Sequence, residues 1–224
     1  MTLDHQHSIK LKYGIASFKN LRINYWSIPK CGNTSIKYAL LRTEDPERFE
    51  RLLLKHNSSD TDNVNQWIHS VGVCTYIRPD QAGNNGFTNF TVIREPVSRL
   101  LSGYMDFTQK RPAHGMGGSR QFVRWFRQLR KTPNVFLLIH LLEQCPDHQR
   151  DVHFRSQKSY CLNDDLIMLK LANIATTIKK INPDIVLDVK LHTTGEKAPL
   201  AQDLTNRINK IYHHDVKLWE QAAE

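Results

Sequence analysis

A lysine, a small-residue turn and two hydroxyl side chains stand together in residues 23–41, INYWSIPKCGNTSIKYALL, between a strand pattern and a helix pattern. Lys30 supplies a cation, and the turn at Gly32–Asn33 tolerates the backbone angles of a tight reversal. Thr34 or Ser35 can cap the following helix, whose first N–H groups have no acceptor inside that helix. Because these N–H groups, the helix dipole and the lysine converge, the stretch predicts a binding site for phosphate or sulfate.

A second set of anion-binding side chains follows a near-continuous apolar run in residues 89–101, NFTVIREPVSRLL. Arg94 comes directly after the run, and Pro96 is suited to the first position of a helix. The run is typical of a buried parallel strand, and ligands of α/β proteins bind at the carboxyl ends of such strands. Ser98 and Ser102 lie one helical turn apart, so both can face the same anion.

Strand and helix patterns alternate along the rest of the chain. Strands are expected at residues 23–28, 67–77, 89–93, 166–169 and 185–189. Helices are expected at residues 35–42, 46–56, 119–130, 173–181 and 199–219 and after residue 96, with a further core element at 134–145. This order predicts an α/β fold with a central, mainly parallel sheet flanked by helices. We expect residues 1–20 to form an N-terminal arm, in which Ile15 and Phe18 pack back onto the domain, and residues 21–224 to form a single domain.

Composition indicates the class of ligand and the cellular location to expect. The formal net charge of +9 favours an acidic ligand, although charge alone does not choose among a nucleotide, a nucleic acid and an acidic polymer. The chain has no apolar run near the length of about 18 residues that a membrane helix needs, and its first residues lack a signal-peptide pattern. We therefore expect a cytoplasmic protein. The four cysteines show no zinc-site spacing, so we expect free thiols and no metal.

Several segments together resemble one enzyme family. IPKCGNTSIK at 28–37 resembles the 5′-phosphosulfate-binding loop of sulfotransferases that use 3′-phosphoadenosine 5′-phosphosulfate (PAPS), and IREPVSRLLSGY at 93–104 resembles their 3′-phosphate-binding element. The similarity is to the carbohydrate branch, related to heparan sulfate 2-O-, chondroitin and HNK-1 sulfotransferases. His69, the box HFRSQ at 153–157 and the Tyr-x-x-Asp ending within 208–219 also fit that branch. The chain departs from it in the Cys-Gly-Asn of the loop and in Ser156, where proline is common.

The resemblance implies a P-loop-NTPase-like sulfotransferase fold and in-line transfer of a sulfuryl group from PAPS to a hydroxyl of a carbohydrate-type acceptor, without a metal. It implies that Lys30 stabilises the leaving phosphate and that Arg94 and Ser102 hold the 3′-phosphate. It makes His69 the general base, because a histidine with the ordinary pKa of about 6.5 can accept a hydroxyl proton when neutral. The donor-binding residues implied are Lys30, Cys31, Gly32, Asn33, Thr34, Ser35, Arg94 and Ser102.

Other interpretations of the same residues stay open. His69 can be a structural histidine at a strand end, and His153 is a rival base whose other role is to brace its loop. The loop at 28–37 is not a Walker A motif because its lysine precedes its glycine, yet a nucleotide-dependent phosphoryl-transfer enzyme is one alternative. A non-enzymatic polyanion or nucleic-acid binder is another, suggested by the net charge and the arginine-bearing helix at 120–130.

The expected partner is a hydroxyl-bearing acceptor, a glycan by resemblance. Nucleic acid is not expected, because no RRM, KH, helix-turn-helix or zinc-finger signature is present. We expect the loops at 57–66 and 108–118 to set acceptor specificity, but their sequences carry no readable sugar code. No pattern in the sequence indicates an oligomeric state.

Overall fold

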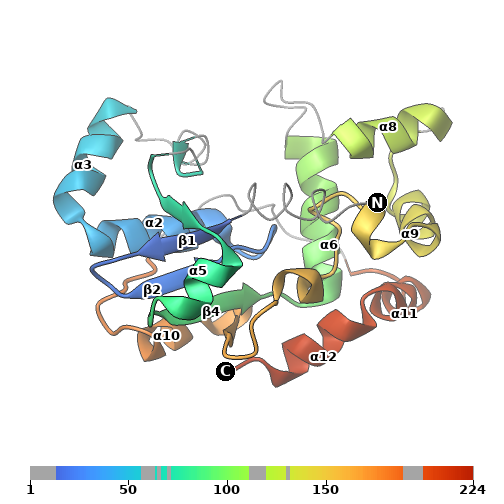
Figure 1. Cartoon of the computed structure of the whole chain (residues 1–224). Coiled ribbons are helices and arrows are strands. Elements are labelled where there is room, and N and C mark those ends of the chain that lie inside the picture. Colours follow the sequence, from blue (N-terminus) through green and yellow to red (C-terminus); the bar gives the residue numbers. More distant parts are fainter. Residues whose placement is uncertain are drawn as a thin grey trace. The chain divides into compact units, whose positions relative to one another are not determined.

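The computed structural model describes residues 14–56, 64, 67–69, 72–110, 120–129, 132–188 and 199–223. The chain divides into two compact units, and its helices and strands are coloured along the sequence in Figure 1. The first unit holds Met1–Ile93, Tyr160–Thr193 and Gln221–Glu224, and the second holds Arg94–Ser159 and Thr194–Glu220. Residues 1–13 of the expected arm, and most of the loops at 57–66 and 108–118, lie outside the described residues.

The first unit is built on a five-stranded sheet with the order β3-β1-β2-β4-β5. Its strands are β1 (Ile15–Phe18), β2 (Ile23–Trp26), β3 (Thr75–Ile77), β4 (Thr88–Ile93) and β5 (Ile167–Lys170). Strands β2, β4 and β5 are parallel, whereas β1 pairs antiparallel with both β2 and β3. The expected α/β fold, mainly parallel in the centre of the sheet, is confirmed.

Helices cover both faces of this sheet, because successive strand residues point to opposite sides. The helical elements of the first unit are α2 (Asn33–Glu44), α3 (Pro46–Lys55), α5 (Pro79–Asn84), η4 (Leu171–Asn173), α10 (Ile174–Thr177) and η5 (Ile178–Lys180). Tyr25 of β2 packs in the main core with Leu40 of α2 and Ile178 of η5. Its neighbour Trp26 packs with Ala82 of α5 in a smaller cluster. The alternation in β2 thus holds α2 and α5 on opposite faces.

The predicted start of helix α3 is confirmed, whereas that of helix α2 is shifted. Asp45 caps α3 by accepting a hydrogen bond from the Arg48 N–H at 2.9 Å, with Pro46 at the first helical position. Helix α2 begins at Asn33, two residues before the predicted start at Ser35. The difference arises because Gly32 adopts a left-handed conformation and itself ends the turn.

The strands of the structure depart from the expected ones in three places. Ile15 and Phe18, expected in an arm, belong to β1 in the sheet. Of residues 67–77, only Thr75–Ile77 forms a strand, because pairing with β1 extends no further. The described part of the expected strand at 185–189 is not a strand. Near the end of the chain, Ala223 bridges to β5 instead, donating to the Met168 carbonyl at 2.8 Å and accepting from the Lys170 N–H at 3.3 Å.

The second unit is helical. Its elements are α6 (Pro96–Met105), η1 (Asp106–Lys110, a π-helix), α8 (Arg120–Leu129), α9 (Val135–Gln144), η2 (Asp147–Gln149), η3 (Gln157–Tyr160), α11 (Gln202–Ile211) and α12 (His213–Gln221). Helix α11 packs against both α6 and α9. Leu100, Leu138, Phe154 and Ile208 are buried in the shared core. The unit therefore has its own hydrophobic core.

The last helix was predicted to be continuous over 199–219, but it is divided at Tyr212. Tyr212 leaves the helical conformation with φ −112° and ψ 33°, and its hydroxyl donates to the Phe154 carbonyl at 2.6 Å. Asp215, three residues later, accepts hydrogen bonds from the N–H groups of Gln157 and Lys158. The break thus lets the Tyr-x-x-Asp segment hold the loop that carries the HFRSQ box.

Candidate functional site

The loop between β2 and α2 contains two residues in the left-handed region. Lys30 has φ 68° and Gly32 has φ 77°, and the Cys31 N–H between them donates to the Ile28 carbonyl at 3.2 Å. A positive φ is uncommon for a residue with a side chain and costs about 1–2 kcal/mol. Such strain is concentrated at functional sites, where the surrounding structure holds it in place. The half-buried Lys30 is therefore fixed in an unusual conformation at the predicted anion site.

Gly32 is favoured at the entry to α2 for two reasons. Its left-handed backbone disfavours any residue with a side chain, and a Cβ built there lies 2.8 Å from Leu171 Cδ1. No side chain caps this helix, and its first described backbone bond runs from the Ile36 N–H to the Gly32 carbonyl at 3.0 Å. The first turn therefore keeps the dipole and N–H geometry that suit an anion.

Asn33 ties the loop to the strand before it. The Tyr25 hydroxyl of β2 donates to Asn33 Oδ1 at 2.6 Å. Burial, and to a smaller extent the neighbouring Cys31, holds the pKa of Tyr25 well above its usual value, so the phenol remains a donor. Cys31 is itself fully buried, which makes its thiol part of the packing beneath the loop. In the Cys-Gly-Asn sequence, the cysteine thus contributes packing, the glycine the left-handed turn, and the asparagine a hydrogen bond.

His69 lies beside α2, in contact with the predicted anion-binding helix. Its Nε2 is 3.2 Å from Thr34 Oγ1, and its Nδ1 is 3.3 Å from Lys37 Nζ. The imidazole is exposed, whereas Thr34 is buried. The structure therefore brings together, in the first unit, the predicted base and the loop from Lys30 to Ser35.

Lys37 is a member of this cluster that the motif comparison did not single out. Only 3% of its surface is exposed, and its Nζ donates to the Tyr76 hydroxyl at 3.0 Å. Burial lowers the pKa of Lys37 to about 8, with an opposing influence from Cys74. A signal was present in the sequence, because residue 37 lies on the same helical face as the core residues Leu40 and Leu41. A lysine there interrupts the buried face of the helix.

Arg94 and Ser102 belong to the second unit, Arg94 just before α6 and Ser102 within it. Arg94 Nε donates to Ser98 Oγ at 3.2 Å, so these two side chains face one another. Glu95 caps α6 by accepting from the N–H groups of Val97 and Ser98 at 2.9 and 2.6 Å. Ser102 is one turn further along and is 97% buried, since only 3% of its surface is exposed.

Gln157 holds the backbone of Arg94 in place. Its Oε1 accepts from the Arg94 N–H at 2.9 Å, and its Nε2 donates to the Arg94 carbonyl at 2.8 Å. Gln157 is fully buried, and its own N–H donates to Asp215 Oδ2 at 2.8 Å. Asp215 of α12 therefore supports Gln157, which in turn fixes the residue predicted to bind a phosphate. Sequence comparison flagged the HFRSQ box and the Tyr-x-x-Asp ending, but not this connection between them.

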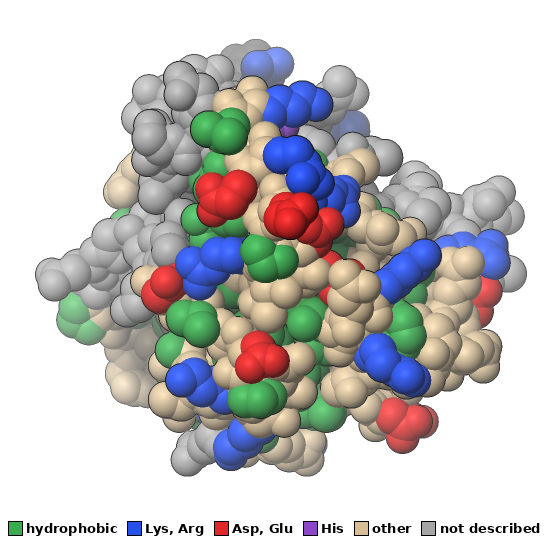
Figure 2. Space-filling model, turned by 90° about the vertical axis from the view of Figure 1, so that its left-hand side faces the viewer, with side chains coloured by type: hydrophobic (Ala, Val, Ile, Leu, Met, Phe, Trp, Pro, Cys, Tyr) green, Lys and Arg blue, Asp and Glu red, His purple; other side chains and the backbone are tan. Residues whose placement is uncertain are grey.

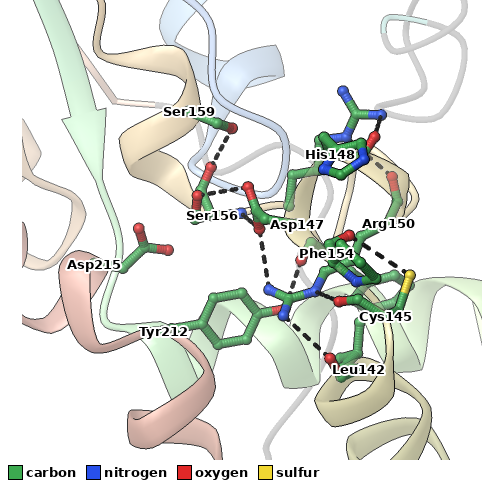
Figure 3. A network of polar contacts seen from close by, with 12 residues as sticks. Leu142, Cys145, Asp147, His148, Arg150, Phe154, Ser156, Ser159, Tyr212 and Asp215 are labelled. Carbon is green, nitrogen blue, oxygen red and sulfur yellow. Dashed lines mark hydrogen bonds and ion pairs between the residues drawn. The ribbon is translucent and has the colours of Figure 1, made fainter. Parts of the chain in front are cut away.

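The remainder of the HFRSQ box is anchored by its neighbours (Figure 3). Asp147 accepts from both the N–H and the hydroxyl of Ser156 at 2.8 Å, and it also pairs with Arg150 at 3.0 Å. A serine at this position, where the resemblance led to an expectation of proline, thus adds a hydroxyl contact to the loop. His153, the rival base, pairs with Asp151 at 2.7 Å and packs edge-on against Phe107. These contacts favour its loop-bracing role.

Within the described ranges, no group of three or more histidine, cysteine or acidic side chains is arranged to hold a metal ion. In the same part of the chain, no helix has the length and apolar character needed to cross a membrane.

An α/β domain with a lysine-glycine loop of positive φ at a helix N-terminus has the features expected of a site for anions of the phosphate or sulfate type. The family model described as "Sulfotransferase family" matches residues 15–190 of the 224-residue chain, so the protein belongs to the sulfotransferase family. No curated protein and no solved structure matches the chain. Family membership supports sulfuryl transfer as the activity, in agreement with the resemblance of the two anion-binding stretches.

Proposed function

We propose that this sulfotransferase moves a sulfuryl group from PAPS to a hydroxyl of a carbohydrate-type acceptor, with His69 as the general base. The observation that carries the proposal is the contact between His69 and Thr34, at 3.2 Å, on the helix that the Lys30–Gly32 loop opens. A proton acceptor beside a loop suited to the phosphosulfate end of the donor supports this assignment. The family match supports the same reaction class.

The loop residues fit the donor's phosphosulfate. Gly32 supplies the left-handed turn that opens α2, and the N–H groups at the start of a helix suit a bound anion. Lys30 supplies a cation that stabilises negative charge on the leaving phosphate, and Thr34 and Ser35 add hydroxyl groups. Sulfuryl transfer resembles phosphoryl transfer in needing positioning and charge stabilisation more than covalent chemistry. No metal is part of this scheme.

At the other end of the donor, Arg94 and Ser102 are the proposed ligands of the 3′-phosphate. An arginine suits this role because its guanidinium can donate two parallel hydrogen bonds to a phosphate. The Arg94 side chain already contacts Ser98. Gln157 holds the Arg94 backbone by hydrogen bonds to both its N–H and its carbonyl. A preorganised arginine loses less conformational entropy when it binds.

His69 is suited to accept the proton of the acceptor hydroxyl because the residue is exposed and its ring is oriented by contacts with Thr34 and Lys37. A base that is already oriented raises the rate by keeping reacting atoms in reach. The family supports a hydroxyl-bearing acceptor, and the glycan is our proposal from the carbohydrate-branch resemblance.

The surface gives limited support to a polyanion-binding protein. On the face seen in Figure 2, basic and acidic side chains of the described residues are interspersed with hydrophobic ones. In the first unit, Arg42 pairs with Asp188 and Arg78 pairs with Asp80, each at 3.0 Å. Pairing of this kind offsets the positive charge that a nucleic-acid surface would gather on one face.

Binding of adenosine 3′,5′-bisphosphate tests the donor site. At a ligand concentration of about 100 times Kd, binding should stabilise the protein by about 3 kcal/mol and raise its Tm by several degrees. Lys30→Ala and Arg94→Ala should lose most of this rise, and His69→Ala should keep it. Lys55→Ala, at an exposed lysine of α3, is the control that should also keep it. A protein that shows no rise at millimolar ligand would contradict the proposal.

Activity is tested with labelled PAPS and a panel of glycans, lipids and small alcohols. We expect a sulfated glycan, with transfer lost in His69→Ala although that variant still binds the bisphosphate. Normal transfer by His69→Ala would exclude it as the base. Magnesium-dependent ATP binding would instead indicate a phosphoryl-transfer enzyme, and salt-sensitive RNA binding unaffected by Lys30→Ala would indicate a polyanion binder.

A further inference from the structure

The lysine beneath His69 is an unusual group for the interior of a helix–sheet core. Lys37 is 3% exposed, and its Nζ lies 3.3 Å from His69 Nδ1 and 3.0 Å from the Tyr76 hydroxyl. The same Nζ lies 4.9 Å from the centre of the Tyr76 ring. Among the described residues, no carboxylate is within ion-pair distance of it. A buried cation without a carboxylate partner is costly, which points to a functional reason for its position.

The protonation state of Lys37 determines what His69 can do. An ammonium group has only donors, so with Lys37 charged the neutral ring must accept at Nδ1 and carry its proton on Nε2. Nε2–H then donates to Thr34 Oγ1, and the nitrogen on that side is not a base. With Lys37 as a neutral amine, its lone pair can accept from Nδ1–H. Nε2 then holds the lone pair and can accept a proton.

We propose that Lys37 is a positioning residue that selects the tautomer of His69, making Nε2 basic when Lys37 is an amine and acidic when Lys37 is an ammonium. This inference rests on the proposed role of His69. The change is balanced by bulk water: Lys37 Nζ releases one proton, while the ring loses its Nε2 proton and gains one at Nδ1. The pair therefore loses one proton in total, and no other reactant is needed.

The surroundings of Lys37 place this change in an accessible pH range. Burial lowers the pKa of Lys37 to about 8, and Cys74 opposes that shift. Burial also raises the pKa of Cys74, with Arg48 of α3 acting in the opposite direction. Burial likewise raises the pKa of the Tyr76 phenol well above its usual value. The thiol and the phenol thus stay neutral while Lys37 titrates.

The ring nitrogens of His69 report the tautomer directly. Full-length protein labelled with 15N-histidine is followed by long-range 1H–15N NMR from pH 6.5 to 10, and His69→Gln identifies the signals. In the wild type we expect the neutral ring to move from the Nε2–H form to the Nδ1–H form as the pH rises through about 8. Lys37→Arg, a permanent cation, should keep the Nε2–H form throughout.

Lys37→Met removes the cation while keeping an unbranched side chain of similar length, so it should lose the crossover near pH 8. Lys55→Met, at an exposed position on α3, should behave as the wild type. The same tautomer at every pH in the wild type, or an unchanged crossover in Lys37→Arg, would overturn the inference. The wild-type titration decides the matter even if a variant fails to fold.

Kinetics separate this inference from the proposed reaction. If the protein sulfates an acceptor, Lys37→Arg should lower kcat at pH 8 by at least about tenfold, with little change in the bisphosphate affinity. An absence of sulfation combined with the NMR crossover would reject the reaction and retain the Lys37–His69 pairing. Sulfation without the crossover would reject the pairing and retain the reaction.

Discussion

Replacing Lys37 by methionine should make the folded protein more stable at neutral pH. In the unfolded chain Lys37 has its ordinary pKa of 10.5, whereas burial lowers the pKa to about 8 in the folded protein. At about 1.4 kcal/mol per pH unit, this difference corresponds to a penalty of about 3 kcal/mol on the charged form. Lys37→Met removes the penalty but also the hydrogen bond to Tyr76, worth about 1 kcal/mol. The expected net gain at pH 7 is therefore about 2 kcal/mol.

The sign of the pH dependence follows from proton counting. Between pH 8 and 10.5 the unfolded chain binds more protons at Lys37 than the folded protein does. The penalty is therefore present in full below the folded pKa, and it disappears as the pH rises toward the unfolded pKa. The stability advantage of Lys37→Met should shrink across this interval by about 3 kcal/mol and reverse its sign.

Urea unfolding followed by tryptophan fluorescence at several values between pH 7 and 10.5 measures this difference. The comparison between wild type and variant cancels the titration of groups elsewhere in the chain. Lys55→Met is the matched control, because its exposed side chain should give a difference that does not vary with pH. The reasoning is refuted if Lys37→Met differs from the wild type by the same free energy at every pH.

Three further substitutions test how the candidate site is built. Gly32→Ala should destabilise the fold by about 1–2 kcal/mol and weaken bisphosphate binding, because φ is +77° there. Urea unfolding measures the loss of stability, and the ligand-induced Tm shift measures the loss of binding. Gly103→Ala in α6 should cost about 1–3 kcal/mol by urea unfolding, since its Cβ would lie 2.8 Å from the fully buried Phe154 ring. Gln157→Leu should cost about 2–3 kcal/mol and raise the bisphosphate Kd measured by calorimetry, because it removes both hydrogen bonds to the backbone of residue 94.

Gly83→Ala is the control for the two glycine substitutions. Gly83 lies in helix α5, and a Cβ there meets nothing within 4 Å. Alanine should be neutral or stabilising by up to about 1 kcal/mol through helix propensity. If Gly32→Ala were as stable as Gly83→Ala, the left-handed turn would not require glycine for stability. If Gly103→Ala were as stable, the contact with the Phe154 ring would not disfavour a side chain there. A Gln157→Leu variant with unchanged bisphosphate affinity would separate Gln157 from the phosphate site.

Short-range signals made much of the first unit predictable. The alternating pattern of β2, the helix start at Asp45-Pro46 and the apolar run of β4 each depend on residues a few positions apart. They were therefore visible in the sequence and are found in the structure. The strand at Ile15–Phe18 was not visible in this way, because its antiparallel pairing with β2 and β3 makes it a strand.

The sequence by itself determined the loop from Lys30 to Ser35, the Arg94 element and the α/β class, because turn residues, helix starts and hydrophobic period act locally. Only the tertiary structure decided that Lys37 is buried against His69, 32 residues away, and that Gln157 holds Arg94, 63 residues away. These contacts depend on how strands and helices pack, which no pattern within one segment records. The motifs thus supplied the functional groups, and the packing determined which of those groups can exchange protons with one another or hold one another in place.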